Sequence, residues 1–518
     1  NATDDATVIT IAEIDSTSGS VSVTSSGGTN GTITVAAGEG GIVTGAAPIQ
    51  LNAGTVVTIN DVLTTTGNGA ITIDAGRANI SANLQSDGGT IDLTDVPNVV
   101  IDGTVTFDSD FGDNDAAGDI LFSTVVGDQI DADAVARTFT IDARGGTDGG
   151  TVTLGAVTPD AANGGGVRLD ELTVQTDGAS GVINVQGGTV ETTGSQDFEG
   201  PVVVNSPTDS TTFDGTNLTF QSTVRGAADA VEAVTLIDDG RTILNGEVGG
   251  NGQRLTNLTT DSAGNGAGVT EIRADISTSG NQTYHDAVEL DTPADTVTLT
   301  ADGDIVFQQT LRSLTDGEEQ VIVNADGVTR FVGDVGDNSQ RLRRLETDSD
   351  GAAGTTEIGA NIDTVGTVEA LRFGDDVLLI NGPVVLTTTA SGVVPSAADV
   401  VFERTLNGSQ NLTLSIEGET TFTGAVGANN AIGTNTGAAI TINSTGPTEF
   451  QSTVQTASGI AQDDAAGDVT FRENVTVAAG DTATTFDANV VLDGLTFDAA
   501  NAVSFGNMAA DTLRLSGD

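Results

Sequence analysis

A short apolar pattern returns along most of the chain and limits what it can fold into. In each copy, an aromatic or aliphatic residue is followed four positions later by Val or Leu, as in FEGPV or FQSTV. Residues at i, i+2 and i+4 of a β-strand point to the same side. The pattern therefore predicts strands with one buried face. The copies begin at Phe198, Phe220, Leu244, Tyr284, Phe307, Phe331, Phe402, Phe422, Phe450 and Phe471.

The spacing of these copies indicates a solenoid. Several successive copies lie about 20 to 25 residues apart, which is the length of one solenoid coil, and the larger gaps are near twice that. We read one strand of this type per coil of about 22 residues, with an occasional coil whose strand is degenerate.

A longer period is laid over the short one. The step from Gly194 to Gly280 equals the step from Gly280 to Gly366, which is 86 residues. The segment from Gly246, GEVGGNGQRLTNLTTDS, returns from Gly333 as GDVGDNSQRLRRLETDS. We therefore assign 191–518 to coils of the FxxxV type, in duplicated units of about 86–91 residues.

Residues 1–190 carry a plainer signature, in which Gly precedes alternating branched residues. Examples are GTITV from Gly31, GAITI from Gly69 and GTVTL from Gly150. Gly supplies the turn and the alternation predicts a half-buried strand. We expect this Gly- and Thr-rich part to continue into 191–518 as one rod.

The expected fold is all-β, a parallel β-helix or β-solenoid. Aromatic residues make up 3% of the chain and Trp is absent, which suits a thin stack of small aliphatic side chains better than a thick core. The alternative is a tandem array of immunoglobulin-like β-sandwiches, because the longer period is close to the size of one such domain. The shorter period inside each unit and the missing Trp favour the solenoid.

Charge restricts the partners. The formal net charge is -56, and all 17 basic residues are Arg. The negative electrostatic field of such a chain repels the phosphate backbones of nucleic acids and the anionic head groups of lipids. We therefore expect neither nucleic-acid binding nor association with membranes. No apolar run is long enough for membrane insertion, and the first residues lack the features of a signal peptide. We expect an extracellular or cell-surface location, where ions screen the charge, and we read the chain as a mature product or a segment of a longer one.

A resemblance follows from two stretches of the sequence. GAITIDAGRANISANLQSDGGTIDL from Gly69 and LTTDSAGNGAGVTEIRADISTSG from Leu258 resemble the repeat regions of large secreted bacterial β-helical surface proteins, of the filamentous haemagglutinin and autotransporter passenger type. The likeness covers nearly the whole chain, although its motifs are loose. It implies a right-handed β-helix, export through an outer-membrane transporter, and a role in adhesion, biofilm or a surface layer.

Two acidic clusters are candidate calcium sites. In ETDSDGAAGTTE, the side chains of Glu346, Asp348, Asp350 and Glu357 match positions 1, 3, 5 and 12 of a calcium loop, with Gly351 at the sharp turn. Glu replaces the usual Asp at the first position, and no helices flank the loop. In DNDAAGDILF, three carboxylates could gather around one cation at a coil corner, and they recur in DDAAGDVTF from Asp463. They are Asp113, Asp115 and Asp119.

We expect a non-enzymatic structural or adhesive protein. The single His, His285, fits an exposed strand position, and no nucleophile or phosphate-binding motif is present. Calcium is the one cofactor with a candidate site. Expected partners are further copies of the chain, which unpaired strand edges would join end to end, and a glycan or cell-surface receptor. The alternative is a carbohydrate-active lyase or hydrolase on the same β-helix, acting through carboxylates.

Overall fold

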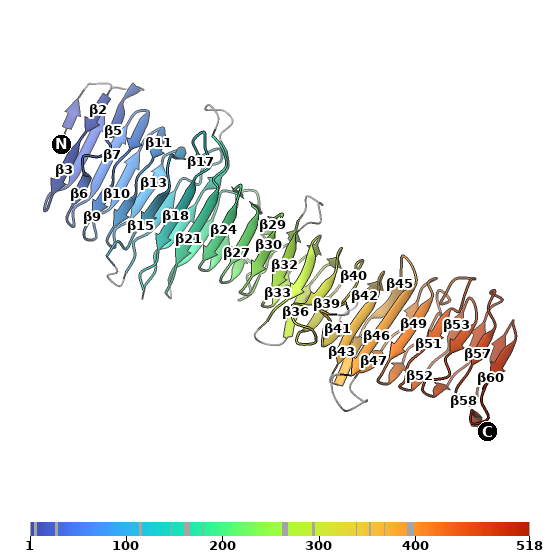
Figure 1. Ribbon diagram of the computed structural model, residues 1–518. Coiled ribbons are helices and arrows are strands. Elements are labelled where there is room, and N and C mark those ends of the chain that lie inside the picture. Colours follow the sequence, from blue (N-terminus) through green and yellow to red (C-terminus); the bar gives the residue numbers. More distant parts are fainter. Residues whose placement is uncertain are drawn as a thin grey trace. The chain divides into compact units, whose positions relative to one another are not determined.

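In the residues that it describes, the computed structural model consists of β-strands and the turns that join them (Figure 1). It describes residues 2–4, 8–25, 30–112, 116–146, 148–159, 166–178, 180–261, 268–292, 296–337, 339–351, 354–366, 368–390 and 398–516. The chain divides into two compact units, Asn1–Gly268 and Val269–Asp518. The sequence predicts a boundary at residue 190 instead, where the repeated sequence pattern changes. That boundary separates two kinds of coil, and it stays a prediction.

Unit 1 has three parallel faces, here called A, B and C. Face A holds β1 (Ala2–Asp4), β4 (Val21–Ser25), β7 (Ile49–Ala53), β10 (Ile71–Asp74), β13 (Ile91–Asp95), β16 (Ile120–Phe122), β19 (Thr151–Leu154), β22 (Val182–Val185), β25 (Val202–Val204) and β28 (Val224–Gly226). Face B holds β2 (Val8–Ile11), β5 (Thr32–Val35), β8 (Val56–Ile59), β11 (Arg77–Ile80), β14 (Asn98–Ile101), β17 (Gln129–Ala132), β20 (Ala156–Val157), β23 (Thr189–Glu191), β26 (Ser210–Asp214), β29 (Ala233–Ile237) and β31 (Leu258–Thr260). Face C holds β3 (Glu13–Ser16), β6 (Gly41–Thr44), β9 (Leu63–Thr65), β12 (Leu84–Ser86), β15 (Val105–Asp108), β18 (Thr138–Ala143), β21 (Glu171–Thr176), β24 (Ser195–Glu199), β27 (Asn217–Phe220) and β30 (Arg241–Leu244).

Unit 2 repeats the arrangement. Its face A holds β33 (Ile276–Thr278), β36 (Thr296–Ala301), β39 (Gln320–Ala325), β41 (Arg344–Thr347), β44 (Val368–Phe373), β47 (Ala398–Phe402), β50 (Thr420–Phe422), β52 (Thr448–Phe450), β55 (Val469–Phe471), β58 (Val490–Asp493) and β61 (Leu513–Ser516). Its face B holds β34 (Gln282–Tyr284), β37 (Ile305–Phe307), β40 (Val328–Phe331), β42 (Thr355–Ile358), β45 (Asp376–Leu379), β48 (Leu406–Asn407), β53 (Val454–Thr456), β56 (Val475–Val477) and β59 (Phe497–Ala499). Its face C holds β32 (Val269–Ile272), β35 (Ala287–Leu290), β38 (Leu311–Ser313), β43 (Ile362–Gly366), β46 (Val384–Ala390), β49 (Leu412–Ile416), β51 (Ile440–Ile442), β54 (Ile460–Gln462), β57 (Thr484–Phe486) and β60 (Val503–Phe505).

Each strand pairs in parallel with the strand one turn before and one turn after it on the same face. Paired residues on successive turns lie about 24 positions apart, as Phe307 and Phe331 illustrate on β37 and β40. The predicted β-solenoid is confirmed. Immunoglobulin-like sandwiches are excluded, because their sheets are antiparallel and the named strands of the described chain pair in parallel.

The repeated FxxxV pattern spans a corner of the solenoid, and the prediction that it forms a single strand is wrong. Phe450 ends β52 on face A, whereas Val454 begins β53 on face B. In the same way, Phe198 lies on β24 and Val202 on β25. Both apolar residues of a copy are buried, because the chain bends between them and turns each side chain toward the interior. The four-residue spacing therefore describes a turn between two faces.

In-register aromatic rings form short columns in the interior. The longest column joins Phe373, Phe402, Phe422, Phe450 and Phe471, whose neighbouring ring centroids lie 4.9, 4.6, 4.7 and 4.9 Å apart. All five rings are buried. Each ring lies on the next because parallel pairing repeats the same position on every turn. A second column joins Tyr284, Phe307 and Phe331.

Asn and Asp side chains tie successive turns together at the corners. In each case, the side-chain Oδ1 accepts a hydrogen bond from a backbone N–H one turn further along. The N···Oδ1 distances are 2.8 to 3.0 Å, and the accepting residues are Asn83, Asp119, Asn281, Asp304, Asn361, Asn411, Asn474 and Asn489. Many polar turn residues are therefore structural, and this use explains part of the acidic composition.

A buried glutamine occurs in two copies of the long repeat, but its hydrogen bonds differ between them. Gln282 lies inside unit 2, where its Nε2 donates to the carbonyl oxygen of Thr300 at 2.8 Å and its Oε1 accepts from Tyr284 Oη at 2.9 Å. Gln196 holds the matching position in unit 1, but Phe198 replaces the tyrosine. Gln196 Oε1 is buried without a hydrogen-bond partner.

We expect the substitution Tyr284→Phe to lower the free energy of unfolding by about 1–2 kcal/mol, because it leaves Gln282 Oε1 buried without a donor. The reciprocal change Phe198→Tyr supplies a donor to Gln196 Oε1 and is expected to raise stability by up to about 1 kcal/mol. Urea unfolding followed by circular dichroism measures both. Equal stability of Tyr284→Phe and the natural chain would contradict this assignment.

Candidate functional site

The residues of the predicted calcium loop are engaged in separate interactions. Glu346 points outward from β41, where its carboxylate lies 2.7 Å from Arg344 Nη1 and 3.5 Å from Arg372 Nε. Glu357 lies on β42, on a different face, and its Oε2 accepts from Arg330 Nε at 2.5 Å. The structure therefore does not bring Glu346 and Glu357 together.

Asp348 faces another carboxyl group that the sequence analysis did not single out. Asp348 is 5% exposed and has a φ of 54°, and Asp375 is 1% exposed. The two side chains are within hydrogen-bonding reach of each other, and Asp350 approaches Asp348 from the solvent side. Burial, followed by the negative charge of Asp348, raises the pKa of Asp375 to about 7. Two adjacent buried carboxyl groups cannot both ionise readily, which favours a single proton shared by the pair.

Polar neighbours hold this pair in place. Thr356 Oγ1 lies 3.5 Å from Asp375 Oδ2, and Arg404 Nη2 lies 3.8 Å from Asp348 Oδ2. Asp375 is the third residue of FGDDV, a further copy of the FxxxV pattern, and Arg404 is the third residue of the copy one turn later. The sequence signal for the pair was therefore a charged residue at the third position of that pattern.

The second predicted calcium cluster lies only partly within the described residues. Asp113 and Asp115 are outside them. Asp119 Oδ1 accepts from the backbone N–H of Thr151 at 2.8 Å, which is one of the corner bonds. Within the ranges that the structure describes, no three Asp, Glu or His side chains are arranged to hold a metal ion. Calcium binding stays a prediction.

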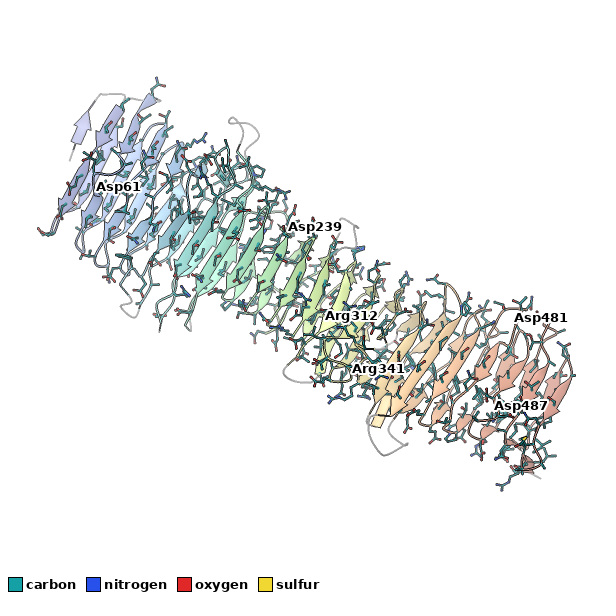
Figure 2. The ribbon with its side chains drawn as sticks, in the orientation of Figure 1. Asp61, Asp239, Arg312, Arg341, Asp481 and Asp487 are labelled. Carbon is teal, nitrogen blue, oxygen red and sulfur yellow. The ribbon has the colours of Figure 1, made fainter. Side chains whose placement is uncertain are left out.

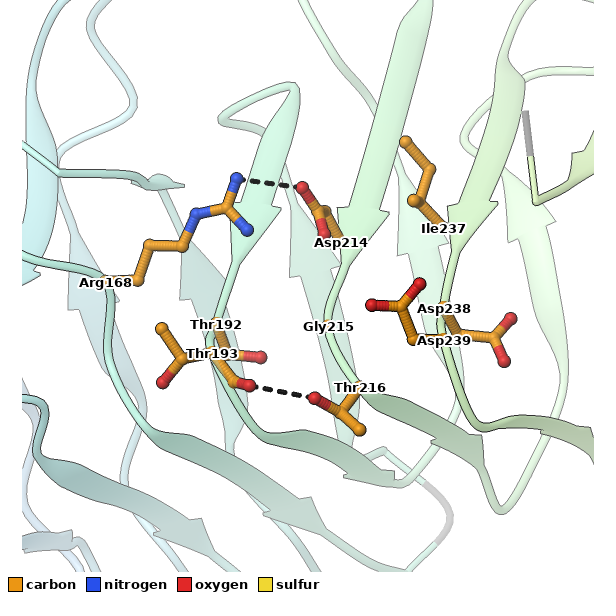
Figure 3. A pocket seen from close by; sticks show the side chains of 9 residues that line it. All are labelled: Arg168, Thr192, Thr193, Asp214, Gly215, Thr216, Ile237, Asp238 and Asp239. Carbon is orange, nitrogen blue, oxygen red and sulfur yellow. Dashed lines mark hydrogen bonds and ion pairs between the residues drawn. The ribbon is translucent and has the colours of Figure 1, made fainter. Parts of the chain in front are cut away.

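A polar hollow of about 360 Å³ lies over the edge of faces B and C in unit 1 (Figure 3). Arg168 forms ion pairs with Asp214 at 2.9 Å and with Glu191 at 3.1 Å. Thr216 Oγ1 donates to the carbonyl oxygen of Thr193 at 2.8 Å. These contacts hold carboxylates, hydroxyl groups and a guanidinium around one space. The lining residues are Arg168, Thr192, Thr193, Asp214, Gly215, Thr216, Ile237, Asp238 and Asp239.

Asp238 lies beneath this hollow and is 1% exposed. Thr242 Oγ1 donates to Asp238 Oδ1 at 2.7 Å. Burial raises the pKa of Asp238 to about 6, and the carboxylate of Asp261 acts in the same direction. The hollow therefore combines Asp214, which is ion-paired with Arg168, with the buried carboxyl group of Asp238, whose pKa burial raises. Its nine lining residues include no aromatic ring on which a sugar could stack.

His285 lies between β34 and β35, outside both strands, and is partly exposed, whereas Tyr284 is buried. No helix within the described ranges combines the length and apolar character that crossing a membrane requires. Comparisons with protein-family models, with curated proteins and with solved structures each gave no match for this chain.

Proposed function

We propose that the chain is a non-enzymatic structural or adhesive protein that acts outside the cell, as part of a cell-surface adhesin, fibre or layer. One observation carries the proposal: each unit is a stack of parallel turns whose interior repeats in register. Such a stack gains length with every added turn. The duplicated segments within 191–518 indicate that length was extended in this way.

The proposed mechanism is mechanical. Parallel pairing, aromatic columns and corner hydrogen bonds resist separation of the turns, while the net charge of -56 keeps the copies apart in dilute solution. Cations or partner molecules then bring the copies together. Expected partners are further copies of the chain, including end-to-end addition of strands, and a glycan or receptor at the cell surface. The acidic surface disfavours nucleic acid.

Calcium dependence tests this mechanism. If cations bridge copies through surface carboxylates, addition of calcium should increase the scattering mass and EDTA should reverse the increase. Light scattering at constant ionic strength measures the effect, with magnesium as the control for general screening. Identical scattering mass with calcium, magnesium and EDTA would remove calcium bridging from the proposal.

The hollow around Arg168 favours one alternative, a carbohydrate-active enzyme. Two carboxyl groups in different surroundings, one ion-paired and one buried, can serve as base and acid in glycoside chemistry. Incubation with a panel of acidic and neutral polysaccharides, followed by reducing-sugar analysis, tests it. Cleavage that is lost in Asp214→Asn would establish the enzyme, and intact polysaccharide throughout would reject it.

A further inference from the structure

One surface of unit 2 carries almost no charge. Strands β49, β51, β54, β57 and β60 of face C contain no Asp, Glu or Arg, and all five lie within the described residues. Figure 1 shows these strands as successive parallel arrows. In the stretch 405–462, which contains three of these strands, the only charged residues are Glu417, Glu419 and Glu449. This depletion is unusual in a chain with 17% charged residues.

Face A of the same turns is charged, whereas β53 and β56 of face B contain no Asp, Glu or Arg. Face A carries Asp399 on β47, Glu449 on β52 and Asp493 on β58, while face B carries Asp498 on β59. On face A, Arg472 bridges Glu449 and Asp493 at 2.5 and 2.9 Å. The five strands of face C are therefore uncharged along the whole run from β49 to β60, whereas face A of the same turns carries charge.

Small side chains cover this neutral surface. Thr413, Thr441, Ala461 and Thr485 point outward, are partly exposed, and follow one another in register from β49 to β57. Because each is small and each sits on a regular parallel sheet, a second sheet could approach closely. Packed sheets lie about 10 Å apart.

The connections from face B to face C extend the same neutral surface. Asn411 Oδ1 accepts from the backbone N–H of Thr434 at 2.8 Å, and its Nδ2 donates to the carbonyl oxygen of Thr436 at 3.1 Å. The one carboxylate in these connections, Asp481, accepts from the backbone N–H of Gly437 at 2.9 Å. Figure 2 places Asp481 and Asp487 at opposite edges of this end of the unit. The surface between them is preordered, so little conformational entropy is lost when it is covered.

We propose that this neutral surface, defined by the outward side chains of β49, β51, β54, β57 and β60, is where a second copy of the chain packs side by side. The reason is electrostatic repulsion between copies. Two copies with a net charge of -56 repel wherever their acidic faces meet, and this repulsion weakens beyond about 10 Å. Contact through the neutral surface keeps the acidic faces apart. The inference rests on the proposed self-association and names the surface that serves it.

A single added carboxylate tests the proposal. Thr441→Glu places a charge at the centre of the neutral surface and, in a pair of copies, buries it on both sides. We expect it to raise the dissociation constant of self-association at least about tenfold. Gln455→Glu is the matched control, because Gln455 lies on the same turn, is exposed on face B, and receives the same charge. Thr441→Ala keeps the surface neutral and should retain association.

Sedimentation velocity of the 518-residue chain over a range of concentrations and salt distinguishes the outcomes. The proposal expects self-association that strengthens with salt, is lost in Thr441→Glu and persists in Gln455→Glu. Association that is equally strong in Thr441→Glu, and in Thr413→Glu one turn away, would overturn the proposed surface and leave self-association intact. A natural chain that stays monomeric throughout would overturn both. Equal thermal unfolding of the variants confirms that the charge acts on association.

Discussion

Replacing Phe422 with alanine is expected to lower the free energy of unfolding by about 3–5 kcal/mol, the largest effect of any single substitution considered for this chain. Phe422 lies in the middle of the longest aromatic column, with ring centroids 4.6 Å from Phe402 and 4.7 Å from Phe450. Its removal leaves a cavity that parallel pairing on both sides prevents from closing. The loss includes burial of the ring, its contacts and the empty volume.

Urea unfolding followed by far-ultraviolet circular dichroism measures this loss. Phe422→Leu should lower stability less, because leucine fills part of the space. Thr421→Ala is the control, since Thr421 points outward from the same strand and should change stability by less than about 0.5 kcal/mol. A change below about 1 kcal/mol for Phe422→Ala would show that the column does not support the stack.

The second large effect concerns pH. Asp375 is buried against Asp348, and its pKa rises from the usual 3.8 to about 7. The folded state therefore keeps a proton that the unfolded state loses above pH 3.8. The stabilisation that this proton provides is complete below pH 3.8 and is lost as the pH rises through about 7. The free energy of unfolding falls by at most about 4 kcal/mol over this range. The chain should be less stable at pH 8 than at pH 5.

Asp375→Asn isolates this contribution. The amide cannot ionise, so the variant should lose less stability than the natural chain between pH 5 and pH 8, and should be the more stable of the two at pH 8. Asp498→Asn, which removes an exposed carboxylate on β59, is the control for the change in net charge. Parallel pH profiles for Asp375→Asn and the natural chain would contradict the shared proton.

The sequence predicted the coil but not its corners. Alternation in GTITV and GAITI correctly placed strands directly after Gly31 and Gly69, as β5 and β10 confirm. The FxxxV spacing indicated buried residues correctly, yet it suited both one strand of five residues and a bend between two strands. Side-chain periodicity does not distinguish these cases, because both leave the first and last residues buried. Phe450 and Val454 therefore lie on different faces.

The candidate sites were harder to predict, because they depend on which turns lie next to each other. The contact between Asp348 and Asp375 joins residues separated by a full turn, and its register is set by the lengths of the intervening strands and connections. The calcium-loop prediction relied on positions within one short segment. In the structure, arginines from neighbouring turns pair with Glu346 and Glu357. These arginines lie outside the segment, so the spacing of residues within it could not reveal them.

Electron microscopy of the natural chain at high concentration, with and without calcium, tests the central claim most directly. We expect ordered assemblies, fibres or sheets, in which copies lie side by side along their solenoid stacks. Separate single copies under every condition, together with cleavage of a polysaccharide by the same preparation, would contradict it and favour an enzyme on the same fold.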